Sequence, residues 1–536
     1  MTLAEVKRQP SSPKRRKPFD FTGGMKTAPY TGKGLQRVDN MQFESGFLRR
    51  QHGVSTTRDT SESELYGIGS FQKTTTGEYQ ILYMIASGSK YKLRAWNTTL
   101  ETTITPTGGA GDVEFVGDTF SFAQVGKTGF VGNNDATTPL YSWDGATLTA
   151  VTVAGALDPD RIDALWTDGK RLACIDKTQG TALFSQISGV LTAWSVGGDG
   201  SAVGGVYDSM QDLPTCGVTA GGYSIVFSGE EGQANKIQEI SLGDGNLDIM
   251  VTTKVIGWNC RVGFSGPDKI AKSDNFVYGV KDQGLFKIDP YSGNSENLIE
   301  GSGAMERYWN TLDFSAAVVS YCPDEKMICI STKEKNAAVN DRLILFHEEY
   351  GSFYFKTNLF LVNMAEAGGK LYGITDNDGK VYRVFDPDNH TYFDDTLQRC
   401  RIVTEWDALG DVHAFKRVKK LSLFGSVFED DTISIKTYVN GAFNNVWSNK
   451  QYTGQGSGDD SGGVAVLGEY ELALGAPGSK ELSDMIRKQR TSKKVITVCA
   501  EVECTTDKNF QIHGGLWSFK TRGQLTWESD LSKTIR

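Results

Sequence analysis

The amino-acid sequence predicts an all-β protein: a β-propeller of about six or seven blades, preceded by an extended N-terminal arm and followed by a C-terminal β-sandwich-like domain. Three observations predict this organisation. The 536 residues include 61 glycines, 20 tyrosines and 13 prolines, and the chain shows few long helical patterns. That composition is typical of short strands joined by many turns. Strand-like runs also recur through the middle of the chain, and their rhythm changes near residue 395.

The chain opens with a basic tail, residues 1–18. Residues 1–20 carry a local charge of +4, because six lysines and arginines stand against Glu5 and Asp20. The whole chain has a formal net charge of −9, so the remaining residues together carry −13. A charged segment with Pro10 and Pro13 cannot bury a core, and we expect it to be disordered when free. It suits contact with nucleic acid or an acidic partner; the alternative is a tail that is only solvated.

Residues 19–60 are predicted to form an arm with a short hairpin. The stretch reads "FDFTGGMKTAPYTGKGLQRVDNMQFESGFLRRQHG", with a glycine pair near its start and paired arginines near its end. It contains no nucleophile with a base, no metal-ligand cluster and no phosphate loop. An ordinary hairpin of the first propeller blade is the alternative interpretation.

Residues 61–394 are predicted to form the propeller. Seven segments share one pattern, in which a polar turn precedes four to six apolar residues and a second polar turn follows. A spacing of roughly 40 to 50 residues with several short strands in each unit is typical of propeller blades. A single four-stranded blade cannot bury both of its faces, so blades stack around an axis. One aligned apolar position from each segment is Ile81, Phe120, Leu172, Tyr223, Phe276, Met327 and Leu371.

The sequence also predicts tight turns within these units. "DNDG" (Asp376 to Gly379) lies between "KLYGIT" and "KVYRVF", and Gly379 suits the positive φ that a tight hairpin needs. "KDQG" (Lys281 to Gly284) has the same place between "FVYGV" and "LFKID".

Residues 395–536 have a different strand spacing and are predicted to form the β-sandwich-like domain. Alternating segments such as "TISIKTYVNG" and "KKVITVCAEVECT" are separated by a long Gly/Ser/Asp loop, "YTGQGSGDDSGGVAVLG". Alternation with long loops favours a sandwich. The one convincing helical candidate nearby is "SKELSDMIRKQ", where Ser479 suits the N-terminal cap.

No residue earns a catalytic, cofactor-binding or metal-binding assignment, and we expect a protein that is not an enzyme. "GKT" (126–128) lacks the first glycine and the helix of a phosphate-binding loop, so it is predicted to be a hairpin turn. "GDDSGG" (458–463) resembles a serine-protease nucleophile loop but carries an inserted Asp and has no matching histidine context. Eight scattered cysteines and five isolated histidines have no metal-ligand spacing.

Carboxylates recur near the starts of the blades, at Asp168, Asp274 and Asp376. Propeller glycosidases use inward-facing carboxylates. Each of these residues, however, also lies in a turn, where Asp is a natural turn former. No apolar run approaches the roughly 20 residues that span a bilayer, and the N-terminus lacks a signal-peptide core.

The opening stretch resembles the start of tail nozzle and tail hub proteins (DNA-stabilisation, head-to-tail proteins) of short-tailed double-stranded DNA bacteriophages. Those chains begin with a Gly-Gly element, an asparagine-containing strand, a glycine turn and an arginine that precedes a further glycine. The family's usual proline after Gly-Gly stands here at Pro29. The matching positions are Gly23, Gly24, Asn40, Phe43, Gly46, Leu48, Arg49, Arg50 and Gly53.

The resemblance implies a structural protein of the virion tail, assembled in the host cytoplasm. It implies a homohexameric ring below the portal and adaptor proteins that forms the DNA exit channel and retains packaged DNA. Genomic DNA would pass through without sequence-specific binding, and tail fibres or spikes would dock outside. No cofactor is implied. The candidate assembly contacts are Gly23, Gly24, Asn40, Phe43, Gly46, Arg49 and Arg50.

Two alternatives remain open from the sequence. The first is a carbohydrate-binding or glycosidase-type β-propeller, which predicts a funnel with aromatic and paired acidic side chains and activity as a monomer. The second is a monomeric intracellular scaffold propeller, although the chain carries no WD or kelch signature.

Overall fold

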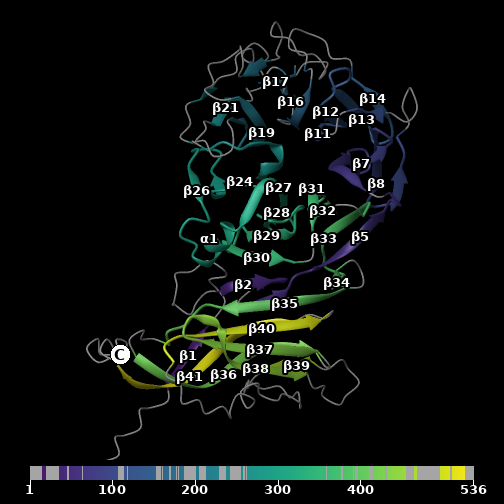
Figure 1. The fold of residues 1–536 in the computed structure, drawn as a ribbon. Helices are drawn as coiled ribbons and strands as arrows, with labels where there is room; N and C mark the ends of the chain where they lie inside the picture. Colours follow the sequence, from purple (N-terminus) through teal and green to yellow (C-terminus); the bar gives the residue numbers. More distant parts are fainter. Residues whose placement is uncertain are drawn as a thin grey trace, which may run out of the picture.

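The computed structural model is an all-β molecule with a ring of small sheets at one end and longer strands at the other (Figure 1). Helix is confined, in the part of the chain that the structure describes, to a 3-10 turn, η2 (Pro267–Lys269), and one short α-helix, α1 (Ala304–Trp309). The structure describes residues 15–19, 35–44, 47–62, 64–106, 114–116, 119–151, 159, 161–167, 171–176, 178, 180–185, 201–203, 213–228, 237–241, 255–256, 260, 262–357, 359–375, 378–389, 391–392, 396–409, 414–428, 431–453, 464–467, 495–506 and 510–524.

Five consecutive antiparallel sheets are arranged as the blades of a β-propeller (Figure 1). They are β6 (Leu65–Lys73), β7 (Glu78–Ser87), β8 (Lys90–Asn97), β9 (Thr102–Ile104) and β10 (Glu114–Phe115); β11 (Phe120–Val125), β12 (Thr128–Asn133), β13 (Leu140–Trp143) and β14 (Leu148–Ala150); β15 (Ile162–Thr167), β16 (Leu172–Asp176), β17 (Thr181–Phe184) and β18 (Ser201–Val203); β19 (Pro214–Ala220), β20 (Tyr223–Ser228), β21 (Ile237–Ser241) and β22 (Val255–Ile256); and β23 (Ile270–Lys272), β24 (Val277–Lys281), β25 (Gly284–Ile288) and β26 (Ser295–Asn297).

Two further four-stranded groups belong to a 14-stranded sheet. One group consists of β27 (Leu312–Cys322), β28 (Met327–Glu334), β29 (Arg342–His347) and β30 (Ser352–Lys356). The other consists of β31 (Leu361–Ala367), β32 (Lys370–Thr375), β33 (Lys380–Asp386) and β5 (Gly53–Asp59). The outer strand of this second group therefore comes from the N-terminal end of the chain, because β5 pairs antiparallel with β33.

The first strands of all these groups contact one another in sequence. β6 contacts β11, and the series continues through β15, β19, β23, β27 and β31, which returns to β6. Close approach between neighbours is visible at Gly69 on β6, where an added Cβ would lie 2.3 Å from the ring of Phe122 on β11. Since side chains of one sheet fill the space above the next, each sheet covers a neighbour's apolar face.

The C-terminal strands join this ring through the N-terminal arm. β2 (Leu35–Asp39) pairs with β30 at one residue and runs antiparallel to β35 (Thr396–Thr404), while β34 (Thr391–Tyr392) pairs with both β5 and β35. The sheet continues from β35 through β40 (Val498–Thr506), β37 (Thr432–Val439) and β38 (Ala442–Thr453). A separate six-stranded sheet holds β1 (Arg15–Phe19), β3 (Met41–Glu44), β4 (Phe47–Arg50), β36 (Ala414–Phe428), β39 (Val464–Leu467) and β41 (Gln511–Gln524).

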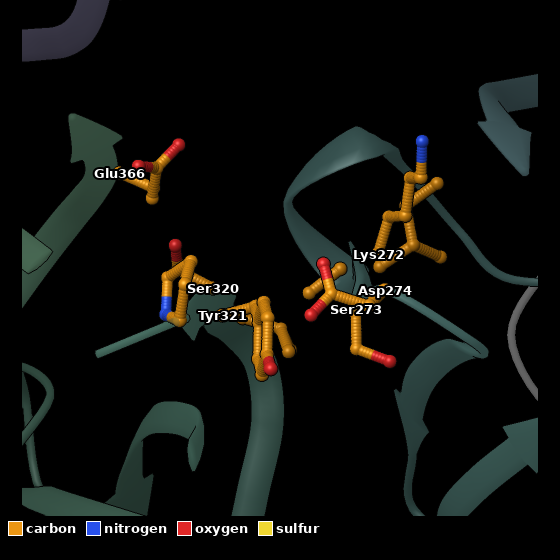
Figure 2. Close-up of a pocket in the computed structure, with 10 residues that line it drawn as sticks. Lys272, Ser273, Asp274, Ser320, Tyr321 and Glu366 are labelled. Carbon is orange, nitrogen blue, oxygen red and sulfur yellow. The ribbon is translucent and has the colours of Figure 1, made fainter. Parts of the chain in front are cut away.

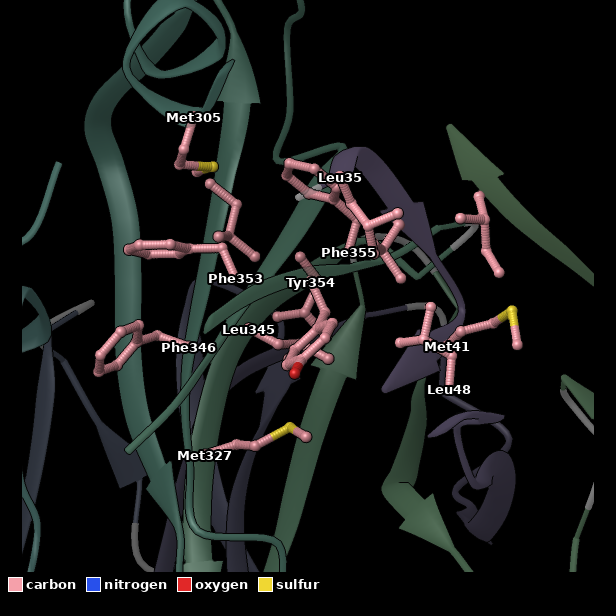
Figure 3. Packing of buried hydrophobic residues seen from close by; sticks show 14 of the residues in the cluster. Leu35, Met41, Leu48, Met305, Met327, Leu345, Phe346, Phe353, Tyr354 and Phe355 are labelled. Carbon is pink, nitrogen blue, oxygen red and sulfur yellow. The ribbon is translucent and has the colours of Figure 1, made fainter. Parts of the chain in front are cut away.

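One apolar core extends from the propeller into the arm. Leu35, Met41 and Leu48 from the arm are fully buried near Leu345 and Tyr354 of the neighbouring propeller strands (Figure 3). The same cluster includes buried residues of both C-terminal sheets, such as Ile402, Ile433, Leu421 and Trp517. Burying apolar side chains is the main favourable term in folding, so this shared core holds the arm against the ring.

Two predictions from the sequence need correction. Residues 15–18 of the expected disordered tail belong to β1, which pairs antiparallel with β41 from Arg15 to Phe19. An edge strand offers unpaired backbone groups, and pairing there outweighs the repulsion of a charged segment. Residues 1–14 lie outside the described part of the chain.

The second correction concerns the alignment of the repeats. Five of the seven aligned positions lie in the second strand of their sheet, but Phe120 opens the first strand, β11, and Phe276 precedes β24. Both strands of the β11–β12 hairpin are rich in apolar residues, so the pattern fits either one. The predicted turns are confirmed: Gly126, Gly284 and Gly379 have φ of +57°, +157° and +61°. The predicted helix near residues 479–489 lies outside the described residues.

Asn40 makes the sharp bend between β2 and β3. Its φ is +58° and its side chain is fully buried. Its Nδ2 donates to the Thr357 Oγ1 at 2.8 Å and to the Arg399 carbonyl at 2.7 Å, while its Oδ1 accepts from the Thr357 backbone N–H at 2.9 Å. One side chain thus bonds the end of a propeller strand to β35 of the C-terminal sheet.

Asn40→Gly keeps the left-handed backbone but leaves the Thr357 N–H and the Arg399 carbonyl without the Asn40 side chain. We expect a loss of about 2–3 kcal/mol in the free energy of unfolding. Asn40→Ala loses the same bonds and is forced into a left-handed conformation, so it should be about 1 kcal/mol less stable again. Urea unfolding of both variants beside the wild type measures this. Equal stability of the Gly and Ala variants would contradict the role given to the backbone.

Candidate functional site

A cavity of about 310 Å³ opens at the ends of three successive inner strands of the ring, β23, β27 and β31. Its polar lining consists of Lys272, Ser273, Asp274, Ser320, Tyr321 and Glu366 (Figure 2). These residues lie at or just after the C-terminal ends of their strands, where the chain turns towards the second strand of each sheet. Loops at one face of a rigid scaffold are a frequent position for binding sites.

The turn after β23 fixes Asp274. The Ser273 backbone N–H donates to the Phe276 carbonyl at 2.9 Å, and the Phe276 N–H donates back to the Ser273 Oγ at 3.2 Å. This closed turn presents the Asp274 carboxylate to the cavity (Figure 2). The turn-forming role that the sequence indicates for Asp274 and its place in a pocket are therefore compatible.

Glu348 organises the hydroxyl groups beside the cavity. Its Oε1 accepts from the Ser273 Oγ at 2.7 Å and from the Tyr278 hydroxyl at 3.2 Å. Burial raises the pKa of Tyr321 well above its usual value, and the carboxylates of Glu348 and Asp274 raise it further. Tyr321 is therefore a neutral phenol that can donate a hydrogen bond but cannot act as a base near neutral pH.

Glu366 lies across the view from Asp274, with Ser320 and Tyr321 between them (Figure 2). Its Oε1 accepts from the Gly369 backbone N–H at 2.7 Å. Burial raises the pKa of the Glu366 carboxyl, the hydrogen bond from Gly369 opposes this rise, and the charge of Asp324 adds to it. The cavity thus offers two carboxyl groups, hydroxyl groups and the Lys272 ammonium, a set that recognises hydroxyl-rich or amine-bearing molecules.

The cysteines do not supply an activated nucleophile. All eight cysteines are buried, and burial raises the pKa of the Cys322 thiol, which is adjacent in sequence to the pocket residue Tyr321, to about 12. A thiol with that pKa is not a nucleophile at neutral pH. Within the residues that the structure describes, no group of three or more His, Cys, Asp or Glu side chains is placed to hold a metal ion. No helix of the described chain is long and apolar enough to cross a membrane.

The predicted assembly contacts lie in the arm. Gly23, Gly24 and Gly46 fall outside the described residues. Leu48↔Ile512 and Arg49↔Gln511 pair the arm hairpin with β41 of the same chain, so the hairpin is not part of the first blade.

The other four candidate residues come together between the propeller and the C-terminal sheets. Asn40 is the bend described above, and the Phe43 ring meets the Tyr350 ring edge-on at 5.1 Å. The Arg49 Nη1 lies 2.9 Å from the His52 Nε2. Arg50 is buried, and its Nη1 donates to the Thr506 carbonyl at 3.1 Å. These contacts are internal to one chain, and a role at a joint between subunits stays a prediction.

His52 links the arm to the turn that follows β27. Its Nδ1 lies 2.7 Å from the Glu325 Oε1, and the side chains of His52 and Glu325 are only 18% and 12% exposed. Arg49 can only donate, so the His52 Nε2 accepts and the proton on Nδ1 points to Glu325. Burial acts to raise the pKa of Glu325, but the hydrogen bonds from His52 and Gln42 and the positive charge of Arg49 lower it to about 2.

Sequence reasoning named Asp274 among turn carboxylates but missed Glu366, Glu348 and the His52–Glu325 pair. A signal existed for Glu366, because it precedes the Gly368–Gly369 turn of a predicted unit. No local pattern connects His52 with Glu325, since 273 positions separate them. Asp168 and Asp376, the other blade-start carboxylates, and the "GDDSGG" loop lie outside the described residues.

Comparison with known proteins gives structural neighbours only. No protein-family model matches the chain, and no curated protein matches it. The extracellular domain of a putative one component system from B. thetaiotaomicron is similar at 10% identity and a TM-score of 0.42, covering 79% of this chain. The match spans 59% of that domain's length.

Two smaller solved structures are also similar. A putative 6-phosphogluconolactonase from Bacteroides fragilis has 14% identity and a TM-score of 0.37, with 65% of this chain and 92% of that chain covered. The Dos1 propeller has 9% identity and a TM-score of 0.36, with 63% and 95% covered. Likeness at this level assigns no activity to the chain.

The His52–Glu325 pair predicts a pH dependence of stability. Because the folded-state pKa of Glu325 is below its unfolded value of 4.5, the pair stabilises the fold above about pH 4.5 and loses this effect as pH falls towards 2. We expect Glu325→Gln to lower the free energy of unfolding by about 3 kcal/mol at pH 7 and by much less at pH 3.

Urea unfolding of the wild type and the variant at both pH values checks this prediction. Glu349→Gln is the matched control, because Glu349 is an exposed partner of Lys326 on a neighbouring turn and a surface pair contributes little. A gap between wild type and Glu325→Gln that stays constant from pH 7 to pH 3 would exclude the proposed linkage.

Proposed function

We propose that the chain is a structural subunit of a virion tail, a nozzle or hub protein of the short-tailed phage type. In this role six copies form a ring below the portal and adaptor, surround the DNA exit channel and retain packaged DNA. The proposal is carried by the motif in residues 19–53 and is supported by where its described residues lie. These residues join the propeller to the C-terminal sheets through buried contacts. Such contacts fix the two parts of one subunit against each other, as a subunit of a ring requires.

We further infer a seven-bladed ring and a C-terminal β-sandwich. The closed series of contacts from β6 through β31 and back to β6 supports seven blades, with the last two contributed by the 14-stranded sheet. The buried cluster shared by the strands around β35 and those around β41 supports two packed sheets. A rigid ring with its turns on one face offers docking surface for neighbouring subunits and for tail fibres or spikes.

The net charge of the chain supports a role as the wall of a DNA channel that catalyses no reaction. The chain is acidic overall, with a formal net charge of −9. An acidic wall repels the phosphate backbone, so DNA slides past it instead of binding at each step. The proposal places the protein in the tail of the virion, assembled in the host cytoplasm, and gives it no catalytic reaction.

The decisive measurement is the size of the assembled protein. One chain has a mass of 58.6 kDa, so a homohexamer has a mass of about 350 kDa. We expect native mass spectrometry of the purified chain, or cryo-electron microscopy of particles that carry it, to show six-membered rings. A protein that stays monomeric at all concentrations and is absent from virus particles would rule the proposal out.

The cavity favours a second candidate, a carbohydrate-binding propeller. Asp274 and Glu366 face one pocket together with the Ser320 and Tyr321 side chains (Figure 2). Carboxylates that accept hydrogen bonds and hydroxyls that donate them are suited to a sugar. This feature matches part of what the carbohydrate alternative predicts from sequence, namely acidic and aromatic groups in one funnel.

Glycan-array screening and calorimetry of the full chain test this second candidate. If it holds, a sugar binds saturably, and the double variant Asp274→Asn/Glu366→Gln weakens that binding at least about tenfold because two acceptor carboxylates are removed. Glu296→Gln, an exposed change on β26 outside the pocket, should leave binding unchanged. Absence of sugar binding by the wild type would eliminate the carbohydrate candidate.

A further inference from the structure

Five neighbouring strands of the 14-stranded sheet have one packed face and one face with exposed side chains. In order across the sheet, these strands are β2, β35, β40, β37 and β38 (Figure 1). Alternate residues of the strands belong to the large apolar core; examples are Ile402, Val502 and Ile435. Successive residues of a strand point to opposite faces of a sheet. The residues between the core positions therefore form the opposite face, which we call the outer sheet face.

The strand register arranges the outer sheet face in rows. Two rows cross all five strands, and neighbouring strands lie about 4.8 Å apart, so each row is about 19 Å long. Beyond these rows, Arg399 pairs with Thr505 at one end and Tyr438 pairs with Val446 at the other. The first row consists of Arg37, Val403, Glu501, Lys436 and Asn449, and the second consists of Asp39, Arg401, Glu503, Ser434 and Gln451.

Ion pairs connect the strands on this face. The Arg401 Nε lies 3.2 Å from the Glu501 Oε1, and the Lys436 Nζ lies 3.5 Å from the same oxygen. The Arg399 Nη2 lies 2.6 Å from the Glu503 Oε2. Each pair joins side chains of neighbouring strands, so the charged groups are held in place before any partner binds.

The cations are the accessible members of these pairs. The side chains of Arg399 and Lys436 are 56% and 32% exposed, whereas those of Glu501 and Asp39 are 5% and 6% exposed. A partner that approaches the outer sheet face therefore meets guanidinium and ammonium groups first. These groups donate hydrogen bonds and accept none, so they are suited to carboxylates.

An apolar corner adjoins the rows at the turn between β37 and β38. The Phe443 ring lies 5.1 Å from the Tyr438 ring and 5.4 Å from the Trp406 ring. Phe443 and Val446 are 48% and 50% exposed. Aromatic and arginine side chains are enriched at protein interfaces, where a few of them contribute most of the binding free energy. The outer sheet face thus has the composition of a protein-binding surface.

The formal charges of the chain are divided between its two parts. Residues 61–394, which include every propeller strand except β5, contain 42 aspartates and glutamates and 25 lysines and arginines. This part therefore carries −17, and since the whole chain carries −9, the other residues carry +8. Accessible cations on the outer sheet face are complementary in charge to the propeller of another copy of the same chain.

We propose that the outer sheet face docks on the acidic propeller of a second copy of this chain. Such a contact joins two unlike surfaces, and its repetition builds a closed ring or an open filament. The closed ring of six rests on the proposed tail function. DNA fits this face less well, because carboxylates alternate with the cations and would meet the phosphate backbone.

Zero-length crosslinking tests which surfaces meet. A carbodiimide joins the Lys436 amine to a carboxylate in direct contact, and unlabelled and heavy-isotope-labelled chains are mixed in equal amounts. We expect peptides of mixed isotope composition that join Lys436 to Asp or Glu within residues 61–394. Products that join Lys436 only to its own chain, or to the C-terminal part of the other copy, would overturn the proposal.

Truncation of the exposed groups measures what they contribute. The triple variant Arg399→Gln/Lys436→Gln/Phe443→Ser removes two accessible cations and the half-exposed ring. In native mass spectrometry over a concentration series, we expect its assembly to have a dissociation constant at least about tenfold higher than that of the wild type. Assembly of the wild type should weaken as salt rises, because ions screen charges at an exposed interface.

A matched control makes the same kinds of change on the ring. Lys326→Gln/Lys335→Gln/Leu100→Ser also removes two exposed cations and one exposed apolar side chain. The acidic groups of the propeller remain in this variant, so it should assemble as tightly as the wild type. Urea midpoints near that of the wild type confirm that both triple variants are folded.

The outcomes separate this interface from the tail function. Equal weakening of assembly in the two triple variants, or rings of the first variant as tight as those of the wild type, would overturn the interface and leave the tail proposal standing. Open chains that carry the Lys436 crosslink and never close into rings would support the interface and contradict the tail proposal. A wild type that stays monomeric would overturn both.

Discussion

Backbone pairing between N-terminal strands and strands more than 300 positions away is the constraint on which the rest of the structure depends. β5 completes the sheet of β31 to β33, and β2, which ends 14 positions before β5 begins, pairs with β35. Closing such long loops costs conformational entropy, although that cost grows only slowly with loop length. The same short stretch therefore closes the ring and attaches the C-terminal sheets, so neither part takes its final shape without the other.

The junction made by this stretch is polar as well as apolar, and its polar groups are buried. Lys356 is 1% exposed, with its Nζ 2.5 Å from the His52 carbonyl, and burial lowers its pKa to about 7. Stability is lost as pH falls from the unfolded pKa of 10.5 towards 7, because the unfolded chain takes up the lysine proton before the folded protein does. Glu325 acts in the same direction at lower pH. Acidification therefore weakens this junction through two groups that also interact, because the charge of Glu325 acts to raise the pKa of Lys356.

Features of the fold that depend on neighbouring residues could be predicted from the sequence. Pairings between strands far apart in the sequence could not. The turns at Gly126 and Gly379 carry their own signal, since tight hairpins need a residue that tolerates positive φ. The repeating apolar pattern likewise predicted the position of the second strand in most of the propeller sheets. By contrast, nothing near β5 or β1 indicates which edge each will pair with, because both partners are distant in sequence. The pocket shows the same division. The sequence gives a turn signal for Asp274, but Asp274 and Glu366 share a pocket only once the strand groups that begin with β23, β27 and β31 are arranged side by side.

The division of charge follows from this assembly of distant segments. In the C-terminal half, β36 carries four cations within five residues, at positions 416, 417, 419 and 420, and β41 contributes Lys520 and Arg522. Cross-strand pairing adds the cations of β36 on one side and those of β1 on the other. Like charges directly opposite one another destabilise a sheet, as at Arg417 and Lys520. Pairing between distant segments therefore decides how the formal charges are distributed over the sheets of a chain that is acidic as a whole.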